Sequence, residues 1–284
     1  MNPVRDAVAA ARSMLFVPGD RPERFSKAAA SGADAIVLDL EDAVGAENKD
    51  AARAAVDTWL GEHADTVAAV VRVNGTETHW HADDVAMLSG HRCAVMLPKA
   101  TCAAQLRGVA AQLGAAVGVI ALIETARGVL AAQEISSADS VVRTAFGSVD
   151  LAAELGVSPD DRDAMHQARG TVILASAAAG RPAPLDGVTT SVSDEDQLCG
   201  DTRYAARLGF GGKLCIHPQQ IEIVNQGFSP SDTDVTWART VVEAAGGDGL
   251  CVVDGRMVDK PVVDRAVRIL ARVASAENPS PLPG

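Results

Sequence analysis

Two apolar segments of the chain run directly into carboxylates. The segment GVIALIE ends at Glu124, and the segment VVRTAFG is followed three residues later by Asp150. An unpaired carboxylate is costly to bury, so acids at the ends of buried strands need a cation nearby. Carboxylate oxygens with neither sulfur nor a close pair of histidines suit Mg²⁺, which binds one or two protein carboxylates and completes its shell with water and substrate oxygens. Glu124 and Asp150 are therefore candidate magnesium ligands; the alternative is that each caps the helix that follows it.

Other charged residues occur near the ends of neighbouring apolar segments. Arg72 and Lys99 are the cations among them, against five carboxylates, and a divalent metal would balance the excess. Glu41 and Asp42 could join the catalytic set by holding Arg72 or a metal-bound water, or could cap the next helix. Lys99 is expected to be an electrostatic partner, because a Schiff-base lysine would be redundant beside a metal. The full set is Asp39, Glu41, Asp42, Arg72, Asn74, Lys99, Glu124, Asp150 and His217, the last expected to be structural.

The elements that would position these residues recur along the chain. Eight short apolar segments alternate with Ala-rich amphipathic segments, many of which end near a glycine, as helices do. Strands that are apolar throughout and alternate with helices are typical of a parallel sheet, and eight such units favour a (β/α)8 TIM barrel over an open sheet. The predicted strands are 13–18, 35–40, 68–74, 94–99, 118–124, 141–147, 184–189 and 213–218. In such a barrel the charged residues would gather where the C-terminal ends of the strands meet.

The chain is expected to divide around this barrel. Residues 1–11 would form an N-terminal arm, and residues 12–228 the (β/α)8 barrel. Residues 229–275 read as a helix, a hairpin with its turn at Asp254–Gly255, and a final helix, a C-terminal extension that would serve as a lid. The Pro-rich residues 276–284 are predicted to be disordered.

Composition excludes several classes of function. With 25 basic and 37 acidic residues the net charge is −12, which disfavours binding to a nucleic-acid backbone, and aromatic residues are too few at 3% to build base-stacking surfaces. The five cysteines form no CxxC pair, so a reduced compartment is more natural than a disulfide framework or a zinc site. No segment looks like a signal peptide or a membrane span. We therefore expect a soluble, cytoplasmic protein that binds neither nucleic acid nor membranes.

Six motifs, in order along the chain, carry a resemblance to a known family. They are RSMLFVPGDRPERFSKAAASGADAIVLDLEDAV, VRVNG, LPKA, ALIETARGV, AFGSVDLAAELG and GKLCIHPQQI. Together they resemble the citrate lyase β-subunit-like (CitE-like) family, within the wider HpcH/HpaI aldolase and malyl-CoA lyase superfamily. The resemblance extends over nearly the whole chain, from Arg12 to about Val273.

The resemblance implies an activity and a cofactor. It implies a Mg²⁺-dependent carbon–carbon lyase on a (β/α)8 barrel, which cleaves or forms a β-hydroxyacyl-CoA such as malyl-, citramalyl- or citryl-CoA. The products of cleavage would be an acyl-CoA and a keto acid, and the CoA thioester would be a substrate. A homo-oligomer, a trimer or a hexamer, is also implied.

The resemblance implies roles for individual residues. Glu124 and Asp150 match metal ligands, and Arg72 matches the arginine that binds the keto-acid carboxylate. Asp259 matches an acid that a neighbouring subunit's C-terminal extension delivers. The remaining matches are substrate-binding positions at Glu124 and Gly147, and CoA-nucleotide-binding positions at Phe16, Arg21 and Lys27.

Two other functions stay open at this point. One is a CoA-independent pyruvate or oxo-acid aldolase, which would not need Arg21 and Lys27. The other is a non-catalytic homologue that binds CoA thioesters or an acyl-carrier partner. The acyl group, the stereochemistry and the physiological direction are not specified by the residues.

Overall fold

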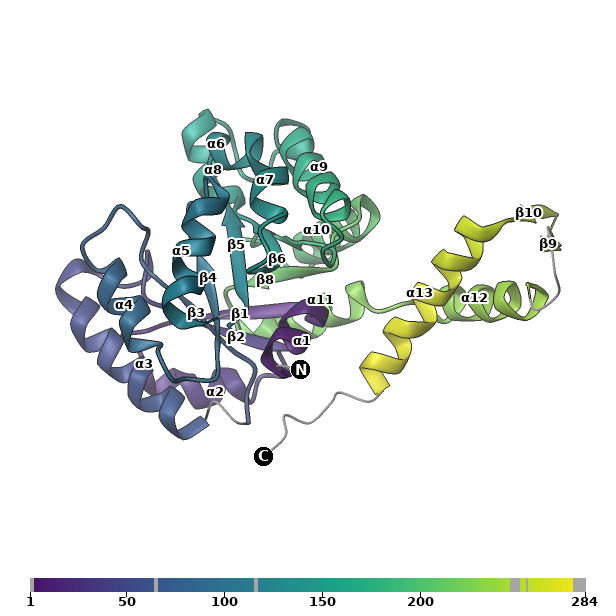
Figure 1. Cartoon of the computed structure of the whole chain (residues 1–284). Helices are drawn as coiled ribbons and strands as arrows, with labels where there is room; N and C mark the ends of the chain where they lie inside the picture. The colour runs from purple at the N-terminus through teal and green to yellow at the C-terminus, as the bar shows by residue number, and fades with distance from the viewer. Residues whose placement is uncertain (1–2, 64–65, 115–116, 246–250, 254, 278–284) are drawn as a thin grey trace. The chain divides into compact units, whose positions relative to one another are not determined.

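The computed structural model contains a closed barrel of eight parallel strands, so the predicted (β/α)8 TIM barrel is confirmed (Figure 1). It describes residues 3–63, 66–114, 117–245, 251–253 and 255–277. The chain forms two compact units, of which the first ends at Gln226 and the second begins at Gly227. Within the described residues, no helix combines the length and apolarity needed to cross a membrane.

The barrel strands occur where the sequence predicts them; β1 has the predicted bounds, and the other seven are shorter than predicted. Each strand pairs in parallel with the next, and β1 closes the barrel by pairing with β8. β7 is the shortest, because Pro184 precedes it and Gly187 follows it. The strands are β1 (Ser13–Pro18), β2 (Ala35–Asp39), β3 (Ala69–Arg72), β4 (Ala94–Leu97), β5 (Val119–Ile123), β6 (Val141–Phe146), β7 (Leu185–Asp186) and β8 (Gly212–Cys215).

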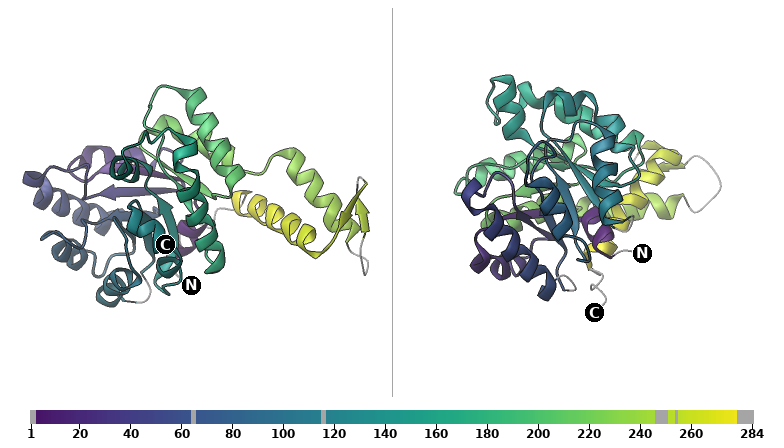
Figure 2. Two further views of the ribbon diagram at one scale, coloured as in Figure 1. Left: turned by 90° about the horizontal axis from the view of Figure 1, so that it is seen from above. Right: turned by 60° about the vertical axis from the view of Figure 1, so that its left-hand side comes forward.

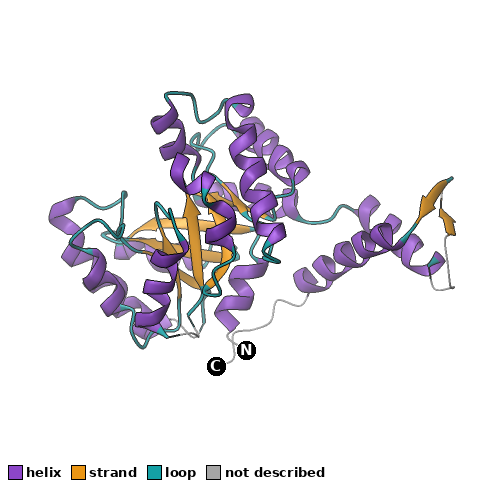
Figure 3. Ribbon diagram, turned by 45° about the horizontal axis from the view of Figure 1, so that its top comes forward, coloured by secondary structure: helices purple, strands orange, loops and turns teal. Residues whose placement is uncertain are grey.

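Helices surround these strands and cover the outer face of the sheet, while the inner face is buried by the side chains inside the barrel (Figures 2 and 3). Burial on both faces is why the strand segments are apolar throughout rather than alternating. The helices of this unit are α1 (Pro3–Ala10), α2 (Phe25–Ala29), α3 (Lys49–His63), α4 (His81–Met87), α5 (Ala103–Leu113), α6 (Ala126–Leu130), α7 (Ala132–Ser136), α8 (Ser148–Leu155), α9 (Arg162–Ala178) and α10 (Glu195–Leu208). Short 3-10 helices occur at Pro22–Arg24, Ala46–Asn48 and Pro218–Gln220.

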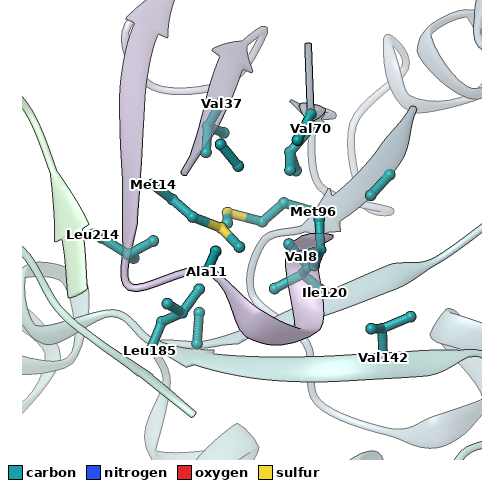
Figure 4. Close-up of a cluster of buried hydrophobic side chains, with 14 of the residues drawn as sticks. Val8, Ala11, Met14, Val37, Val70, Met96, Ile120, Val142, Leu185 and Leu214 are labelled. Atoms are coloured by element: carbon teal, nitrogen blue, oxygen red, sulfur yellow. The ribbon is translucent and has the colours of Figure 1, made fainter. Parts of the chain in front are cut away.

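The barrel interior is filled by side chains from the strands and from α1. Met14 and Met96 lie at its centre, with residues such as Val37, Val70 and Leu214 around them (Figure 4). α1 adds Val4 and Val8 to this cluster. The buried Arg143 of β6 fastens the end of α1, because its Nη1 donates to the carbonyls of Val8 and Ala11 at 3.1 and 2.6 Å. Residues 3–10 are thus a helix that packs on the barrel core.

The C-terminal residues form the predicted helix–hairpin–helix arrangement. α12 (Asp232–Ala244) is followed by β9 (Cys251–Val253), β10 (Arg256–Val258) and α13 (Lys260–Glu277). α11 (Ile221–Phe228) connects this part to the barrel sequence. The two strands pair antiparallel as Arg256 with Val253 and Val258 with Cys251, and Gly255 has a φ of 75°; Asp254, the other residue of the predicted turn, lies outside the described residues. The unit has its own small core, which includes Ala238, Val241, Val253, Val258 and Ala266. The tail predicted to be disordered, 276–284, begins too early in the prediction, because residues 276 and 277 belong to α13; residues 278–284 lie outside the described residues.

Candidate active site

The residues that the sequence places at strand ends come together at the C-terminal end of the barrel strands. Asp39 is the last residue of β2 and Arg72 the last of β3, and the two strands pair so that these residues are neighbours. Glu124 follows β5 directly. Lys99 lies two residues beyond β4, and Asp150 lies in the first turn of α8, after β6. The common direction of the strands therefore brings residues far apart in sequence to one edge.

Arg72 is held by two carboxylates. Its Nε and Nη2 donate to the two oxygens of the buried Asp39 at 2.7 and 2.6 Å, which is a bidentate pair. Its Nη1 lies 3.0 Å from Oε2 of Glu41. Burial alone would lower the pKa of Arg72, but the attraction of Asp39 and then Glu41 outweighs burial and raises it. The ring of Phe16 on β1 lies 4.8 Å from the guanidinium carbon, so the guanidinium is fixed from its face as well as from its edge.

Lys99 connects the remaining acids. Its backbone N–H donates to Oε1 of Glu124 at 2.9 Å, and its ammonium donates to Oε1 of Glu41. The ammonium also lies 3.3 Å from Asp150 Oδ2 and 3.5 Å from Asp42 Oδ2. Burial opposes the charge of Lys99, but the hydrogen bond and attraction of Glu41 outweigh it, so that the pKa of Lys99 is raised. Lys99 is therefore the electrostatic partner that the sequence suggests.

Glu124 is the most strongly perturbed acid of the cluster. It is only 4% exposed, and burial, followed by repulsion from Asp150 and Glu41, raises its pKa to about 8. Gly147 makes this position possible. A Cβ on Gly147 would lie 2.5 Å from Glu124 Oε2, and closer still to Glu124 Cβ. Only glycine therefore leaves room for the carboxylate at this position.

The cluster has the features of a site for a hard divalent cation. Carboxylates outnumber cations, and burial followed by repulsion from Asp150 and Glu41 raises the pKa of Glu124. Among the described residues, no three His, Cys, Asp or Glu side chains are close enough to bind a metal by themselves. Two acids that leave most positions to water and substrate are what Mg²⁺ commonly uses, whereas a structural zinc site would need four side chains. The residues fit magnesium.

The helix-cap alternative is wrong for Glu124. Thr125 caps α6, since its hydroxyl accepts from the N–H of Gly128 at 3.0 Å. The residue that precedes α8 is Gly147, so Asp150 is not the N-cap either, although its charge in the first turn favours the helix dipole. His217 does have the expected structural position, because its Nδ1 accepts from the N–H of Gln219 at 3.3 Å and caps a short 3-10 helix.

Two supporting residues were missed by sequence reasoning. The ammonium of the buried Lys49 donates to the carbonyls of Leu40 and Glu41 at 2.6 and 2.7 Å, so it fixes the turn that presents Glu41. The buried Asp84 accepts from both nitrogens of Asn74, at 2.9 Å for the backbone and 2.6 Å for the side chain. Both lie in helical segments whose polar residues look solvent-facing, so no sequence signal distinguishes them. Asp39, which had no assigned role, is the main partner of Arg72.

Comparison with known proteins places this arrangement in a family. The family model described as HpcH/HpaI aldolase/citrate lyase matches residues 12–218, which include every residue of the cluster. The chain belongs to the HpcH/HpaI aldolase/citrate lyase family.

Several members of the family resemble the chain over most of its length. The citrate lyase subunit beta-like protein of Mycobacterium tuberculosis is 43% identical and covers 94% of this chain, with 97% of that protein covered. A (3S)-malyl-CoA thioesterase of Cereibacter sphaeroides is 38% identical, with 92% of this chain and 94% of that protein covered. A crystal structure of the protein CitE from M. tuberculosis, in complex with magnesium, acetoacetate and coenzyme A, has a TM-score of 0.82 at 40% identity and covers 94% of this chain and 99% of that chain.

The residues to which the HpcH/HpaI resemblance gives a CoA-binding role lie in different places. Phe16 lies at the mouth of the barrel against Arg72. Arg21 and Lys27 are exposed, in the segment that follows β1, and Arg21 lies 3.8 Å from Asp20.

Asp259 is in the second unit, where it caps α13 by accepting from the N–H of Val262 at 3.3 Å. The described contacts thus bring together Phe16, Asp39, Glu41, Asp42, Arg72, Lys99, Glu124, Gly147 and Asp150.

Proposed function

We propose that the chain is a Mg²⁺-dependent carbon–carbon lyase that cleaves or forms a β-hydroxyacyl-CoA such as malyl-, citramalyl- or citryl-CoA. The observation that carries the proposal is a fixed guanidinium, Arg72, that attracts the buried Glu124, while Asp150 lies close enough to repel the same acid, at the C-terminal end of the barrel strands. An arginine fork and a magnesium ion together recognise the carboxylate and the neighbouring oxygen of an oxo acid. The magnesium and coenzyme A in the related CitE structure support the same cofactor and substrate class here.

Arg72 would bind the carboxylate of the oxo acid. Two of the five N–H donors of its guanidinium are used by Asp39, so donors remain on Nη1 and Nη2 for a ligand. Asp39 and the Phe16 ring hold the fork in place before the ligand arrives, which reduces the entropy lost on binding. Glu41 would orient the same fork through Nη1.

Glu124 and Asp150 would hold the metal, which supplies a Lewis acid for the oxygens of the bound oxo acid. In the cleavage direction the hydroxyl proton passes to solvent water, the carbon–carbon bond breaks, and the hydroxyl carbon becomes the carbonyl of the oxo acid. The bonding electrons remain on the α-carbon of the thioester as an enolate, which takes up one proton. We assign that proton to Asp259, delivered from the C-terminal extension of a neighbouring subunit in a trimer or hexamer.

A direct assay tests the proposal. Malyl-, citramalyl-, hydroxymethylglutaryl- and citryl-CoA are incubated with the protein and Mg²⁺, and the oxo acid and acyl-CoA are both quantified. One of the four should yield the two products in equal amounts, and either EDTA or Glu124→Gln should abolish the yield. Turnover that is unchanged with EDTA and in the Glu124→Gln variant would refute the metal-dependent mechanism.

Hydrolysis of the thioester is the second candidate function. It is favoured by the (3S)-malyl-CoA thioesterase of C. sphaeroides, which is 38% identical to this chain. The same assay separates the two reactions, because a lyase releases an oxo acid with the CoA still acylated, whereas a thioesterase releases free CoA and a hydroxy acid. Appearance of free thiol without oxo acid would identify the thioesterase.

Two further candidates are separated by the exposed cations. A CoA-independent aldolase would cleave a free hydroxy-oxo acid at the same rate after Arg21→Ala and Lys27→Ala, whereas a CoA lyase would show a raised KM for its thioester. A protein that only binds a CoA thioester or an acyl-carrier partner would turn over none of the substrates.

A further inference from the structure

We infer that the Lys99 ammonium is an internal counter-ion that holds Asp150 and Glu41 in the metal-free site. By competing with a divalent cation for these acids, it lowers the affinity of the site for the metal. The inference rests on the proposed function, because it concerns the same pair of candidate metal ligands. It assigns Lys99 a positioning role that the family resemblance does not supply.

The geometry places the ammonium among acids that a metal would also use. Its nitrogen donates to Glu41 Oε1 and lies 3.3 Å from Asp150 Oδ2 and 3.5 Å from Asp42 Oδ2. An ammonium has three N–H donors, and here three carboxylates surround it. Asp150, one of the two candidate ligands, therefore already has a cation beside it. A metal must therefore share this carboxylate with the ammonium or displace the ammonium.

The backbone of Lys99 is specialised for the same purpose. Its φ is 50°, and among the residues that the structure describes it is the one non-glycine residue in the left-handed region. Glycine would adopt this conformation at lower cost, so a lysine at this position carries a conformational penalty. The conformation directs the backbone N–H to Glu124 and the side chain to Glu41 and Asp150. One residue thus contacts both candidate ligands.

The charges decide the direction of the effect. Among the described contacts, Lys99 is the cation beside Asp150, and it shares Glu41 with Arg72, whose Nη1 lies 3.0 Å from Glu41 Oε2. Without it the acids repel one another and attract a divalent cation more strongly. With it, a bound metal would also meet a positive charge at short range. Loss of the ammonium should therefore tighten metal binding, provided that the acids stay in place.

Metal binding itself tests the inference. Isothermal titration with MgCl₂ in the absence of any thioester is compared for the wild type, Lys99→Met, Lys99→Arg and Lys99→Gly. We expect the Kd for Mg²⁺ to fall by at least about tenfold in Lys99→Met and Lys99→Gly, and to stay within about twofold in Lys99→Arg. Lys99→Gly is compatible with the left-handed backbone, so it keeps the N–H to Glu124 and remains informative if Lys99→Met does not fold.

The thermal shift gives a second readout, and Arg107→Met on the exposed face of α5 is the control for loss of a positive charge elsewhere. Without metal, Lys99→Met and Lys99→Gly should melt at a lower temperature than the wild type, and Mg²⁺ should raise their melting temperature by more than it raises that of the wild type. Arg107→Met should behave like the wild type in both respects. Equal or weaker Mg²⁺ binding in both neutral variants would overturn the inference while leaving the proposed lyase intact. A wild type that binds Mg²⁺ but turns over no thioester would instead refute the proposed function alone.

Discussion

Glu124 and Gly147 are a matched pair. The carboxylate of Glu124 occupies the space that a side chain at position 147 would fill, since a Cβ there would come within 2.5 Å of Glu124 Oε2. The φ of Gly147 is −96°, so backbone strain does not explain the glycine. Glycine is required at this position for a steric reason, because the side chain of Glu124 from the neighbouring strand needs the space.

Gly147→Ala should therefore displace Glu124 and weaken Mg²⁺ binding without unfolding the barrel. We expect the Kd for Mg²⁺ to rise by at least about tenfold, because one of two charged ligands is turned away. Gly108→Ala on α5 is the control, since nothing lies within 4 Å of its Cβ, and it should bind Mg²⁺ normally. Isothermal titration measures both variants, and normal binding by Gly147→Ala would show that Glu124 is not a ligand.

The buried thiols provide a residue-scale test that is independent of the active site. Burial raises the pKa of Cys93 and of Cys215 to about 12, so both stay neutral near physiological pH. Because the unfolded thiol ionises near pH 9, the unfolded state loses its proton first as the pH rises. The contribution of each thiol to stability is thus fully present below about pH 9 and falls by about 1.4 kcal/mol per pH unit until about pH 12.

Cys93→Ala isolates this effect. Urea denaturation of the wild type and of the variant between about pH 8 and about pH 11 should show a difference in unfolding free energy that is constant at first and then moves in favour of the variant above about pH 9. A difference that does not change over this range would mean that the thiol at position 93 is not buried as described.

At the scale of elements, the turn after β2 matters more than its sequence suggests. It follows Asp39, the last residue of β2, and presents Glu41 and Asp42, while the carbonyls of Leu40 and Glu41 accept from Lys49 in the first turn of α3. The ring of Trp80 also faces this ammonium, at 5.3 Å from its centre. A buried cation on a helix thus fixes the loop that carries the acids.

Lys49→Met should damage this turn. The variant leaves the carbonyls of Leu40 and Glu41 without a charged donor, which should lower the unfolding free energy by about 1–3 kcal/mol. It should also raise the KM for the oxo acid more than it lowers kcat, because the loop orients Arg72 through Glu41 and Asp39. Urea denaturation and steady-state kinetics in the condensation direction measure the two effects. An unchanged KM together with lost stability would mean that Lys49 is structural only.

At the scale of the whole molecule, the proposed acid Asp259 and the barrel site belong to different units of the chain. Asp259 caps α13 in the second unit, whereas Arg72, Glu124 and Asp150 belong to the first. If the second unit of one subunit supplies Asp259 to the barrel of another, one chain can provide Asp259 and a different chain the metal-binding acids. Two chains that are defective at different residues could then form an intact site together.

Mixing defective variants tests this arrangement. Asp259→Asn and Glu124→Gln should each lose at least about a hundredfold in kcat, the first because the proton donor is absent and the second because the metal is. Unfolding and refolding them together should restore a measurable part of the wild-type activity, since some sites would combine an intact Asp259 with an intact barrel. Recovery no greater than for either variant refolded alone would place Asp259 and the metal site on the same subunit or outside catalysis. Asp259→Asn should bind Mg²⁺ like the wild type.

The sequence alone determined the architecture and the identity of most of the charged residues. Eight apolar segments without alternation, each followed by a helical segment, leave a closed parallel barrel as the natural arrangement, because both faces of each strand are buried. Since parallel strands all point one way, the acids and cations at their ends had to meet. The hairpin at Gly255 was equally local, because a two-residue turn depends on the turn residues themselves.

Only the tertiary structure decided which charge pairs with which. Pairing depends on the strand register and on side-chain direction across loops distant in sequence, and no local pattern encodes either. Asp39 holds Arg72 because the ends of β2 and β3 are in register, and Lys99 contacts Glu124 and Asp150 because its φ is positive. Lys49 looked like a surface residue of α3 until the fold buried it against the turn after β2. The composition of the site is thus a property of the sequence, and its network of contacts is a property of the fold.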